Sequence, residues 1–597
     1  MKKRLYALLL SGVLALSLTA CAKQEAKPEA PVETPEANFP VAFCLGAQPA
    51  SLDPKDYAIG DEATYLVNLC SGLVSYRPND SGKVEITADL CDGFPAQETN
   101  EEGKPYYVFT LREDLKWSDG SALTAADFVY SWNRAAGDAD TPERELFSCI
   151  DGFGSGSLNL TASEDGRTLT VVLAKPTPRF FERLANPVFC PVPESAVTVD
   201  GWDRAPGQSV TSGAYTLSDF SDEGMTLTKN KYYWDAANTG PEELDFVFSE
   251  DGDAILDGYL EGRYRVAAGL PAGVTAQLRE SEGSALHVTG RMGNYCICFN
   301  MNDPALSDFT EPERADIRTA LSLLIDRSAI CENIAKLGQR PAASVVPAGM
   351  TDADGSDFAS HNGVSGTGGG YYSVKAEDYA SNCEQAVKLL RGVADSSGKF
   401  KVTKNGVCEG FPTLTYLTSE SAGHVEIANE ITESFQAHGI ELKTSVLKLS
   451  EFLNARAKGD YSMARFSWTA AYDDPASFLT LWAAGAGSNC IGLGQDAHGT
   501  YSGYSATIGG EKVDGRTWAE AYDALIYTVQ GSTDEALRSR CMHEAETLLM
   551  QSGAICPIYE YTGVYLCRDS FKGLFTGPAG ALYFMRADAN IKEGSTS

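Results

Sequence analysis

The stretch MARFSWTAAYDDPASFLTLW, residues 463–482, gathers side chains that could bind a charged ligand. It holds the guanidinium of Arg465, the indole of Trp468 and the adjacent carboxylates of Asp473 and Asp474. A guanidinium can grip a carboxylate through two parallel hydrogen bonds, and a carboxylate can neutralise an ammonium group. The stretch therefore predicts either a ligand site or the cap of a helix that follows a buried strand.

The helix-cap interpretation has support in the same residues. Asp474 before Pro475 is the pattern of an N-cap residue followed by proline at the first helical position. Asp473 precedes that cap and is freer to face a ligand. Arg465 could also belong to a surface ion pair, and Trp468 could be a core aromatic residue, so both alternatives stay open at these positions.

The sequence lacks the motifs of the common exported and nucleotide-driven enzymes. It contains no Gly-x-Ser-x-Gly, no His-Glu-x-x-His and no Gly-x-x-x-x-Gly-Lys-[Ser/Thr], and it has only six histidines. Cys296 and Cys298 alternate along a predicted strand, which favours packing over metal or redox use, and the pairing of the other cysteines cannot be deduced. We expect no enzyme activity, metal or cofactor, with an exported hydrolase as the less favoured alternative.

The first 20 residues predict export from the cytoplasm, and the next 18 predict a tether. Residues 1–20 have a basic start and an apolar run of signal-peptide length. The tetrapeptide Leu18-Thr19-Ala20-Cys21 resembles the lipobox of bacterial lipoproteins, which implies that Cys21 is acylated. Residues 21–38 are rich in Pro, Glu and Ala, and they predict a flexible linker. We expect an extracytoplasmic protein, lipid-anchored at the outer face of the cell membrane or in the periplasm.

The rest of the chain is long, acidic and patterned as a mixture of strands and helices. About 560 residues predict more than one lobe, and the net charge of −33 argues against nucleic acid and against direct adhesion to anionic lipid. Thr124 and Asp127 form a capping box that opens one helix, and a second helix is predicted from Thr310 to Gly338. The strand-like runs of the first half are PYYVFTLRED, RTLTVVLAKP, GAYTLSDF, GMTLTKNKYYW and LDFVFSED.

From Pro412 to Trp468 the pattern alternates as β-α-β-α-β, which predicts parallel strands in an α/β layer. Arg465 to Thr469 would then lie at the carboxyl end of the last strand, where open α/β sheets bind ligands. Two Gly-rich segments, residues 354–373 and 483–499, are predicted to be exposed loops, and Asn489 in the second is a weaker ligand candidate.

Seven segments together resemble the extracellular solute-binding proteins of ABC importers, family 5, which include oligopeptide- and dipeptide-binding proteins. They occur in the family's order across most of the mature chain. The segments are SLDP, LCSGLVSY, YVFTLREDLKWSDGSALTAADFVYSWNRA, SGAYTL, LTKNKYYW, FNMNDPALSD through IRTALSLLIDR, and SWTAAYDDPASFL.

This resemblance implies an α/β, two-lobed periplasmic-binding-protein-like fold of type II, in the large peptide-binding class, with a hinge and an extra subdomain in lobe one. Lobe one would comprise residues 39–295, with residues 555–597 returning to it, and lobe two residues 296–554. The lobes would close on a ligand by a hinge motion, with crossings near NYCICFN and CPIYEYTGVYL.

The resemblance also implies which residues touch the ligand. Family members hold a peptide as an added strand, and Arg465 matches an arginine that can meet its carboxylate. The chain departs from the family at Ala471, where peptide binders carry an aspartate for the ligand's α-ammonium. Either Asp473 or Asp474 takes over this task, or the ligand lacks a free ammonium. The implied ligand-binding residues are Ala58, Gly60, Arg465, Ser467, Trp468, Thr469, Ala471, Tyr472 and Asp473.

The function so implied is that of a monomeric substrate-binding lipoprotein of an ABC importer. It would capture oligopeptides between two lobes and deliver them to a membrane permease, whose partner subunits hydrolyse ATP. The alternatives are a receptor for a specific signalling peptide and a binder of a non-peptide solute, the latter because of Ala471.

Overall fold

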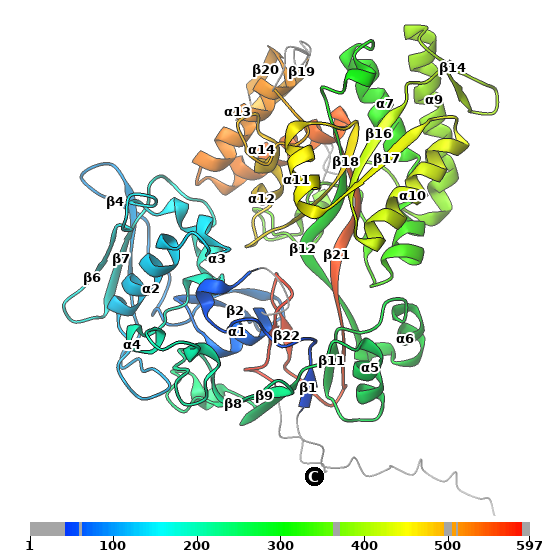
Figure 1. Cartoon of the computed structure of the whole chain (residues 1–597). Coiled ribbons are helices and arrows are strands. Elements are labelled where there is room, and N and C mark those ends of the chain that lie inside the picture. Colours follow the sequence, from blue (N-terminus) through cyan, green and yellow to red (C-terminus); the bar gives the residue numbers. More distant parts are fainter. Residues whose placement is uncertain (1–41, 59–62, 362–369, 495–503, 509–510, 588–597) are drawn as a thin grey trace, which may run out of the picture. The chain divides into compact units, whose positions relative to one another are not determined.

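The main sheet joins strands that are far apart in the sequence. In the computed structural model ten strands follow the order β17-β16-β18-β12-β21-β11-β1-β10-β9-β8, and β13 pairs with β21 (Figure 1). Their bounds, in chain order, are β1 Ala42–Cys44, β8 Tyr215–Phe220, β9 Gly224–Lys229, β10 Glu243–Val247, β11 Val266–Ala268, β12 Leu286–Phe299, β13 Arg340–Pro341, β16 Leu414–Ser419, β17 Leu442–Leu447, β18 Met463–Thr469 and β21 Ile555–Cys567.

The structure describes residues 42–58, 63–361, 370–494, 504–508 and 511–587. The predicted signal, Cys21 and the linker, as well as Gly60, lie outside these residues. The chain divides after Phe39, and Pro40–Ser597 form one unit to which every described residue belongs.

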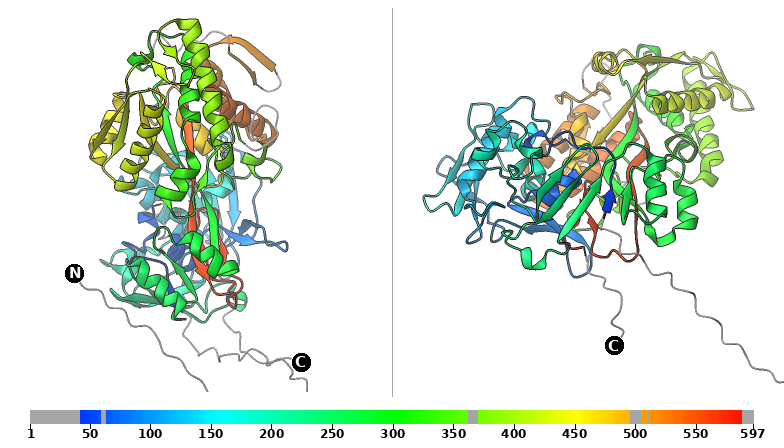
Figure 2. Two further views of the ribbon diagram at one scale, coloured as in Figure 1. Left: turned by 90° about the vertical axis from the view of Figure 1, so that its right-hand side faces the viewer. Right: turned by 60° about the horizontal axis from the view of Figure 1, so that its bottom comes forward.

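Strands β12 and β21 connect the two halves of the main sheet. They pair with each other in antiparallel register from Leu286 opposite Leu566 to Cys298 opposite Ile555, with an irregularity after Gly290. The second edge of β12 pairs with β18, and the second edge of β21 pairs with β11. Figure 2 shows the two long strands side by side. The segments predicted to cross between lobes, NYCICFN and CPIYEYTGVYL, lie in these two strands.

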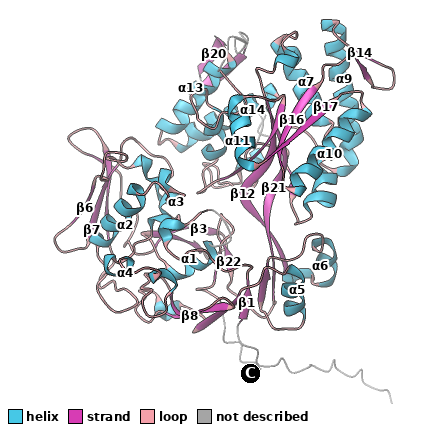
Figure 3. Cartoon of the chain, in the orientation of Figure 1, coloured by secondary structure: helices cyan, strands magenta, loops and turns pink. Residues whose placement is uncertain are grey.

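The predicted β-α-β-α-β unit is confirmed. Strand β16 pairs in parallel with both β17 and β18, and helices α10 (Ala422–Ala437) and α11 (Leu449–Lys458) make the connections. Figure 3 shows both helices beside these strands. Helix α10 forms because its apolar residues recur at helical spacing, and it buries Ile427, Ile431 and Phe435. This unit places the end of β18 at the edge that the sequence predicts.

A separate four-stranded sheet, ordered β4-β5-β7-β6, packs with helix α2 (Ala125–Gly137). The predicted capping box of Thr124 and Asp127 opens this helix, and Phe128 and Trp132 are fully buried on its apolar face. The strand bounds are β4 Glu98–Thr99, β5 Pro105–Thr110, β6 Leu160–Ala162 and β7 Thr168–Val172.

The single helix predicted from Thr310 to Gly338 is wrong in its extent. Its capping box is present, but α7 (Glu311–Leu323) ends early, and α8 (Arg327–Ala329) and a π-helical turn (Ile330–Ala335) follow it. The break has a local cause, because the Asp326 side chain accepts a hydrogen bond from the Ala329 N–H and caps a new helix.

The described parts of the two Gly-rich segments, residues 354–361, 370–373 and 483–494, hold buried residues that the prediction of exposed loops did not include. Asn489 is only 6% exposed, and its side chain donates to the carbonyl of Leu493. Phe358 is fully buried and stacks on the ring of His543, with the ring centres 3.9 Å apart. Apolar residues among the glycines anchor both segments, so prediction from glycine content alone fails here.

Besides short 3-10 helices, the described structure contains a further set of α-helices and strands. They are α1 Ala63–Leu69, β2 Val74–Pro78, β3 Val84–Ala88, α3 Phe180–Leu184, α4 Glu194–Val197, α5 Gly252–Leu260, α6 Thr275–Ser281, α9 Tyr379–Ser397, β14 Lys401–Val402, β15 Cys408–Glu409, α12 Ala476–Leu479, β19 Tyr504–Ile508, β20 Glu511–Arg516, α13 Trp518–Gly531, α14 Glu535–Ser552, β22 Phe575–Thr576 and β23 Leu582–Tyr583.

Candidate functional site

The carboxyl end of β18 has one paired edge and one open edge. Its residues from Met463 to Thr469 pair with β12, whereas β16 pairs only with Met463 and Ala464. No described strand pairs with the second edge of residues 466–469, and the side chain of Trp468 is 37% exposed. The core alternative for Trp468 is therefore wrong. An open strand edge is a template for another extended chain.

Gly293 allows β12 to approach this end of β18 closely. A Cβ atom at Gly293 would lie 2.8 Å from Thr469 Oγ1 and 3.1 Å from the Trp468 carbonyl oxygen. A Cβ atom would also lie 2.9 Å from Tyr561 Cδ2, so a larger residue opposite Thr469 would force the Thr469 and Tyr561 side chains to shift, and glycine avoids this. The close fit on this edge leaves the opposite edge of β18 as the accessible one.

Arg465 is buried without a carboxylate partner. Its side chain points from β18 to the end of β16, where Nε donates to Ser419 Oγ at 3.0 Å, and its guanidinium lies 4.5 Å from the centre of the Phe452 ring. The residue is 7% exposed, yet no described carboxylate forms an ion pair with it. The surface ion-pair alternative for Arg465 is therefore wrong, and the cation lacks a counter-charge.

Two further groups make this place favourable for an anion. His424 Nδ1 lies 3.0 Å from Ser419 Oγ, the same hydroxyl oxygen that accepts from Arg465 Nε, so the hydroxyl joins the imidazole ring to the guanidinium. His424 stands in the first turn of α10, whose N-cap residue Ser421 makes no side-chain cap and whose first turn has no acidic residue. An anion there would also meet the positive end of a 16-residue helix.

The electrostatics agree with this geometry. Burial lowers the pKa of Arg465, and the charge of the neighbouring Arg456 lowers it as well. Burial and the charge of Arg465 together lower the pKa of His424 to about 4. Both pKa values are lowered, as expected where positive charges lie close together without a nearby negative charge. A bound carboxylate would raise the pKa of Arg465 and of His424 again.

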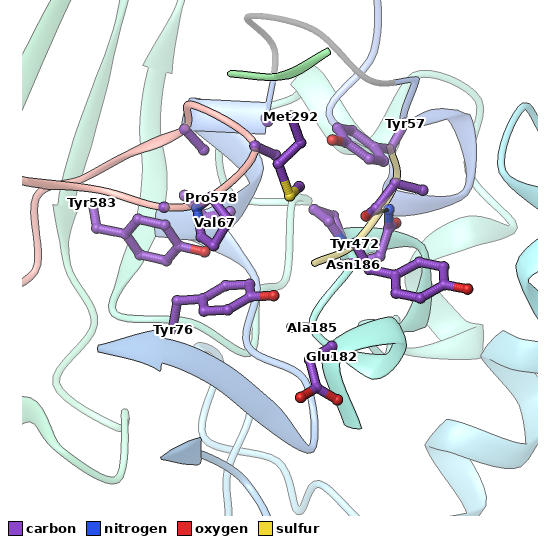
Figure 4. Close-up of a pocket in the computed structure, with 16 residues that line it drawn as sticks. Tyr57, Val67, Tyr76, Glu182, Ala185, Asn186, Met292, Tyr472, Pro578 and Tyr583 are labelled. Atoms are coloured by element: carbon purple, nitrogen blue, oxygen red, sulfur yellow. Dashed lines mark hydrogen bonds between the residues drawn. The ribbon is translucent and has the colours of Figure 1, made fainter. Parts of the chain in front are cut away.

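A pocket lies beyond the other end of the same stretch, where β18 runs into the loop at Ala471. It encloses about 400 Å³ of space not filled by atoms, part of it open to solvent (Figure 4). Of the 16 residues that line it, only one carries a charge, Glu182. The residues that matter most for its chemistry are Tyr57, Tyr76, Glu182, Ala471, Tyr472 and Tyr583.

Helix α3 lies against the loop that carries Ala471 and Tyr472. Asn186 Nδ2 donates to the Ala471 carbonyl at 3.3 Å, and Arg183 Nη2 donates to the Tyr472 hydroxyl at 2.7 Å. The Arg183 guanidinium also lies 4.6 Å from the centre of the Tyr472 ring. Residues 289 and 285 positions apart in the sequence thus form one wall, so two of the predicted site residues face a pocket.

The adjacent aspartates are both engaged by the protein. Asp473 is 8% exposed and accepts hydrogen bonds from the N–H and hydroxyl of Thr351. Asp474 caps α12 by accepting from the Ala476 N–H at 3.1 Å, and both its oxygens accept from Arg538 Nη2, at 2.8 and 3.0 Å. Asp474 thus makes the predicted capping contact, although α12 begins one residue later than predicted, with Pro475 at the N-cap position and Ala476 first in the helix. Its buried partner Arg538 leaves no signal in the local sequence.

The described site residues that the sequence predicted thus lie in four places, and Gly60 lies outside the described residues. Arg465, Ser467, Trp468 and Thr469 lie at the open end of β18, whereas Ala471 and Tyr472 face the pocket. Asp473 points to Thr351 instead. Ala58 is exposed and follows Tyr57, which lines the pocket. The sequence analysis did not identify His424, although its place just after a parallel strand was a usable signal. It also did not identify Glu182, for which the sequence offers no signal.

Within the described ranges, no three or more His, Cys, Asp or Glu side chains gather as a metal site would require. No helix among the described residues has both the length and the apolar character needed to cross a bilayer.

Comparison with known proteins identifies relatives along nearly the whole chain. Residues 92–490 match the family described as bacterial extracellular solute-binding proteins, family 5 Middle. The periplasmic murein peptide-binding protein MppA of Escherichia coli is 27% identical over 544 residues, 88% of either chain. The dipeptide-binding protein DppE of Bacillus subtilis is 26% identical over 503 residues, 81% of either chain.

A solved structure shows the same fold. The MppA periplasmic murein tripeptide-binding protein, in its unliganded open form, superposes with a TM-score of 0.68 at 24% identity, covering 89% of this chain and 93% of that chain. This likeness and the family match confirm the predicted fold class, an α/β fold of the two-lobed periplasmic-binding-protein type.

Proposed function

Because this chain belongs to the bacterial extracellular solute-binding proteins of family 5, we propose that it is the substrate-binding lipoprotein of an ABC importer for oligopeptides. The peptide ligand would bind between two lobes, residues 39–295 with 555–597 and residues 296–554. The closed form would deliver it to the permease, because a ligand that contacts both lobes favours closure by its differential affinity. The names of its relatives, a murein peptide-binding and a dipeptide-binding protein, support a peptide ligand.

The observation that carries the proposal is the unpaired guanidinium of Arg465 beside an open strand edge. A buried cation without a counter-charge destabilises a folded protein by on the order of several kcal/mol. Such an arrangement is useful where an anionic ligand completes the site. The carboxylate of a peptide is such an anion, and the peptide backbone can pair with the edge of residues 466–469.

The direction of the bound peptide follows from the two ends of the site. A strand antiparallel to β18 would bring its carboxyl end to Arg465 and His424 and its amino end to the pocket at Ala471. Side chains of a strand alternate between its two sides, so they would leave the backbone pairing undisturbed. Backbone pairing without matching side-chain contacts favours many peptides over one sequence.

The anchoring and location of the protein are part of the same proposal. The lipobox at Cys21 and the linker to residue 38 support a lipid anchor at the outer face of the cell membrane or in the periplasm. The protein would act as a monomer without catalysis of its own, and ATP hydrolysis would occur on the partner subunits.

Mass spectrometry of the small molecules that copurify with the protein tests this proposal. We expect a mixture of short peptides of varied sequence. A single peptide would indicate a receptor for a signalling peptide, and a non-peptide molecule would indicate another solute. Release of shortened peptides on incubation would indicate a hydrolase. Any of these three results contradicts the proposed oligopeptide uptake.

A further inference from the structure

Two cysteine thiols meet where β12 ends. Cys298 lies on β12, and Cys490 lies 192 positions later, in the segment that follows α12. Their side chains form a hydrogen bond with each other, and both are free thiols in the structure. We infer that Cys298 and Cys490 are a redox-active pair that closes to a reversible disulfide. This modification site goes beyond the proposed function and shares with it only the export of the protein.

The backbone holds the two thiols at this place. The Met301 N–H, two residues beyond the end of β12, donates to the Ile491 carbonyl at 2.9 Å. The Tyr461 hydroxyl donates to the Cys490 carbonyl. Both thiols also pack on one hydrophobic cluster, Cys298 within it and Cys490 at its margin. A disulfide needs two cysteines whose backbones already lie close, and these contacts supply that closeness.

The two thiols differ in reactivity. The hydrogen bond with the Cys298 thiol lowers the pKa of Cys490, and the charge of Arg456 and the Tyr461 hydroxyl lower it further, against the opposing effect of burial. Cys298 is fully buried, and burial raises its pKa. The thiolate is the nucleophile of disulfide chemistry, so Cys490, which is partly exposed, reacts first. An accessible cysteine of low pKa beside a second, resolving cysteine is the arrangement of redox-sensitive pairs.

Two other cysteines lack this combination and serve as controls. Cys383 has intermediate exposure like Cys490, but burial raises its pKa. Cys296 lies two residues before Cys298 on the same face of β12 and packs in the same cluster, and burial raises its pKa as well. The packing role predicted for the alternating cysteines therefore suits Cys296, whereas Cys298 has a second thiol in contact.

The reaction balances as two thiol–disulfide exchanges with an external disulfide, for which oxidised glutathione is a probe. The Cys490 thiolate attacks one sulfur of the external disulfide, forms a mixed disulfide and releases one thiolate, which takes up the proton lost by Cys490. The Cys298 sulfur then attacks the Cys490 sulfur, releases the second thiolate and passes its proton to it. Two protein thiols are thus oxidised, and the external disulfide is reduced to two thiols. Export brings the protein into a compartment where disulfides persist.

The disulfide would tie residues 483–494 to the strand that pairs with both β18 and β21. A link between residues so far apart in the sequence restricts mainly the unfolded chain, and its effect grows with the length of the loop that it closes. We therefore expect oxidation to raise the melting temperature of the ligand-free protein by roughly 5 °C. Dithiothreitol should reverse this shift, and Cys298→Ala should show none.

Peptide mapping by mass spectrometry tests the pairing directly. The full-length protein is reduced, freed of reductant, incubated with oxidised glutathione, alkylated with iodoacetamide in denaturant and digested without reduction. We expect a linked pair of peptides carrying Cys298 and Cys490, two hydrogens lighter than the sum of the separate peptides. Cys298→Ala should instead accumulate glutathione on Cys490, because the resolving thiol is missing. Trypsin leaves Cys296 and Cys298 on one peptide, so Cys296→Ala is the matched control, and it should keep the link.

Three outcomes overturn the inference. Separately alkylated Cys298 and Cys490 after oxidation of the unaltered protein show that no disulfide forms. A link that disappears in Cys296→Ala assigns the bond to Cys296 instead. Iodoacetamide should modify Cys490 of the folded, reduced protein on the order of 10-fold faster than Cys383, and equal rates refute its role as the nucleophile. None of these results depends on a peptide ligand, so the inference and the proposed function can fail separately.

Discussion

Replacing Arg465 by methionine should stabilise the empty protein and at the same time impair its binding of carboxylates. In the folded chain the guanidinium is 7% exposed and has no carboxylate partner. Its removal relieves a desolvation cost of several kcal/mol. It also forfeits one hydrogen bond to Ser419 and the stacking on Phe452, worth about 1 kcal/mol each. Methionine has a similar length and can keep a contact with the Phe452 ring.

The balance of these contributions is a stabilisation of about 1 kcal/mol, to be measured by urea denaturation of the ligand-free protein. Binding should change in the opposite sense. Hydrogen bonds to a charged group contribute about 1.5–3 kcal/mol, so trialanine should bind Arg465→Met roughly 10- to 150-fold more weakly in calorimetry. Trialanine amide, which lacks the carboxylate, should bind both proteins alike.

Arg327→Met is the matched control for the stability measurement. Arg327 is 3% exposed, but its guanidinium donates to Pro557, Ser322 and Cys556, and it stacks on a tyrosine ring at 4.2 Å. Methionine there leaves several buried acceptors unsatisfied, so we expect a loss of about 3 kcal/mol or more. If Arg465→Met destabilises the protein as much as Arg327→Met does, Arg465 is satisfied by the fold and the anion-site reasoning is refuted.

Four further predictions concern the same region. Asp474→Asn should cost about 3–5 kcal/mol in urea denaturation, because it leaves Arg538 buried without its partner; a loss below 1 kcal/mol would contradict this. The pKa of His424 is about 4 in the folded chain and 6.5 ordinarily, so the unfolded chain takes up the proton first. Stability should therefore fall from about pH 6.5 to 4, and denaturation series across this range should be flatter for His424→Gln. Ala471→Asp should strengthen the binding of free-amine peptides in calorimetry, and no gain would mean that another carboxylate already meets the amine. Trp468→Ala should leave the unfolding free energy within about 0.5 kcal/mol, since the indole is exposed, yet weaken peptide binding measured by calorimetry.

Local patterns predicted much of the fold. The capping boxes at Thr124 and Thr310 open helices as expected, and the alternation from Pro412 to Trp468 is a parallel β-α-β-α-β unit. These features depend on residues within a few positions of one another. The prediction of one long helix from Thr310 to Gly338 was wrong for a local reason as well. Asp326 caps a new helix, and the apolar residues around it in the sequence conceal this break.

The sequence predicted where the candidate site lies, but not which charged side chains pair with one another there. The strand pattern located Arg465 and Trp468 at a carboxyl end, and periodicity fixed which side chains share a face. Whether Arg465 has a partner could not be predicted, because 48 basic and 81 acidic residues offer a partner to nearly every charge. Glu182 was not predicted, since α3 has only five residues and too little periodicity to be recognised.

The sequence by itself predicted an exported protein and indicated the α/β fold of the solute-binding family, with Arg465, Ser467 and Thr469 at the end of β18. Only the tertiary structure decided how the charges there are matched. Asp473 turned out to bond to Thr351 and Asp474 to Arg538, 122 and 64 positions away, while Arg465 stayed without a counter-charge. Helix caps and strand periods arise from neighbours in the chain, whereas the partner of a buried charge depends on which distant segments the fold brings together.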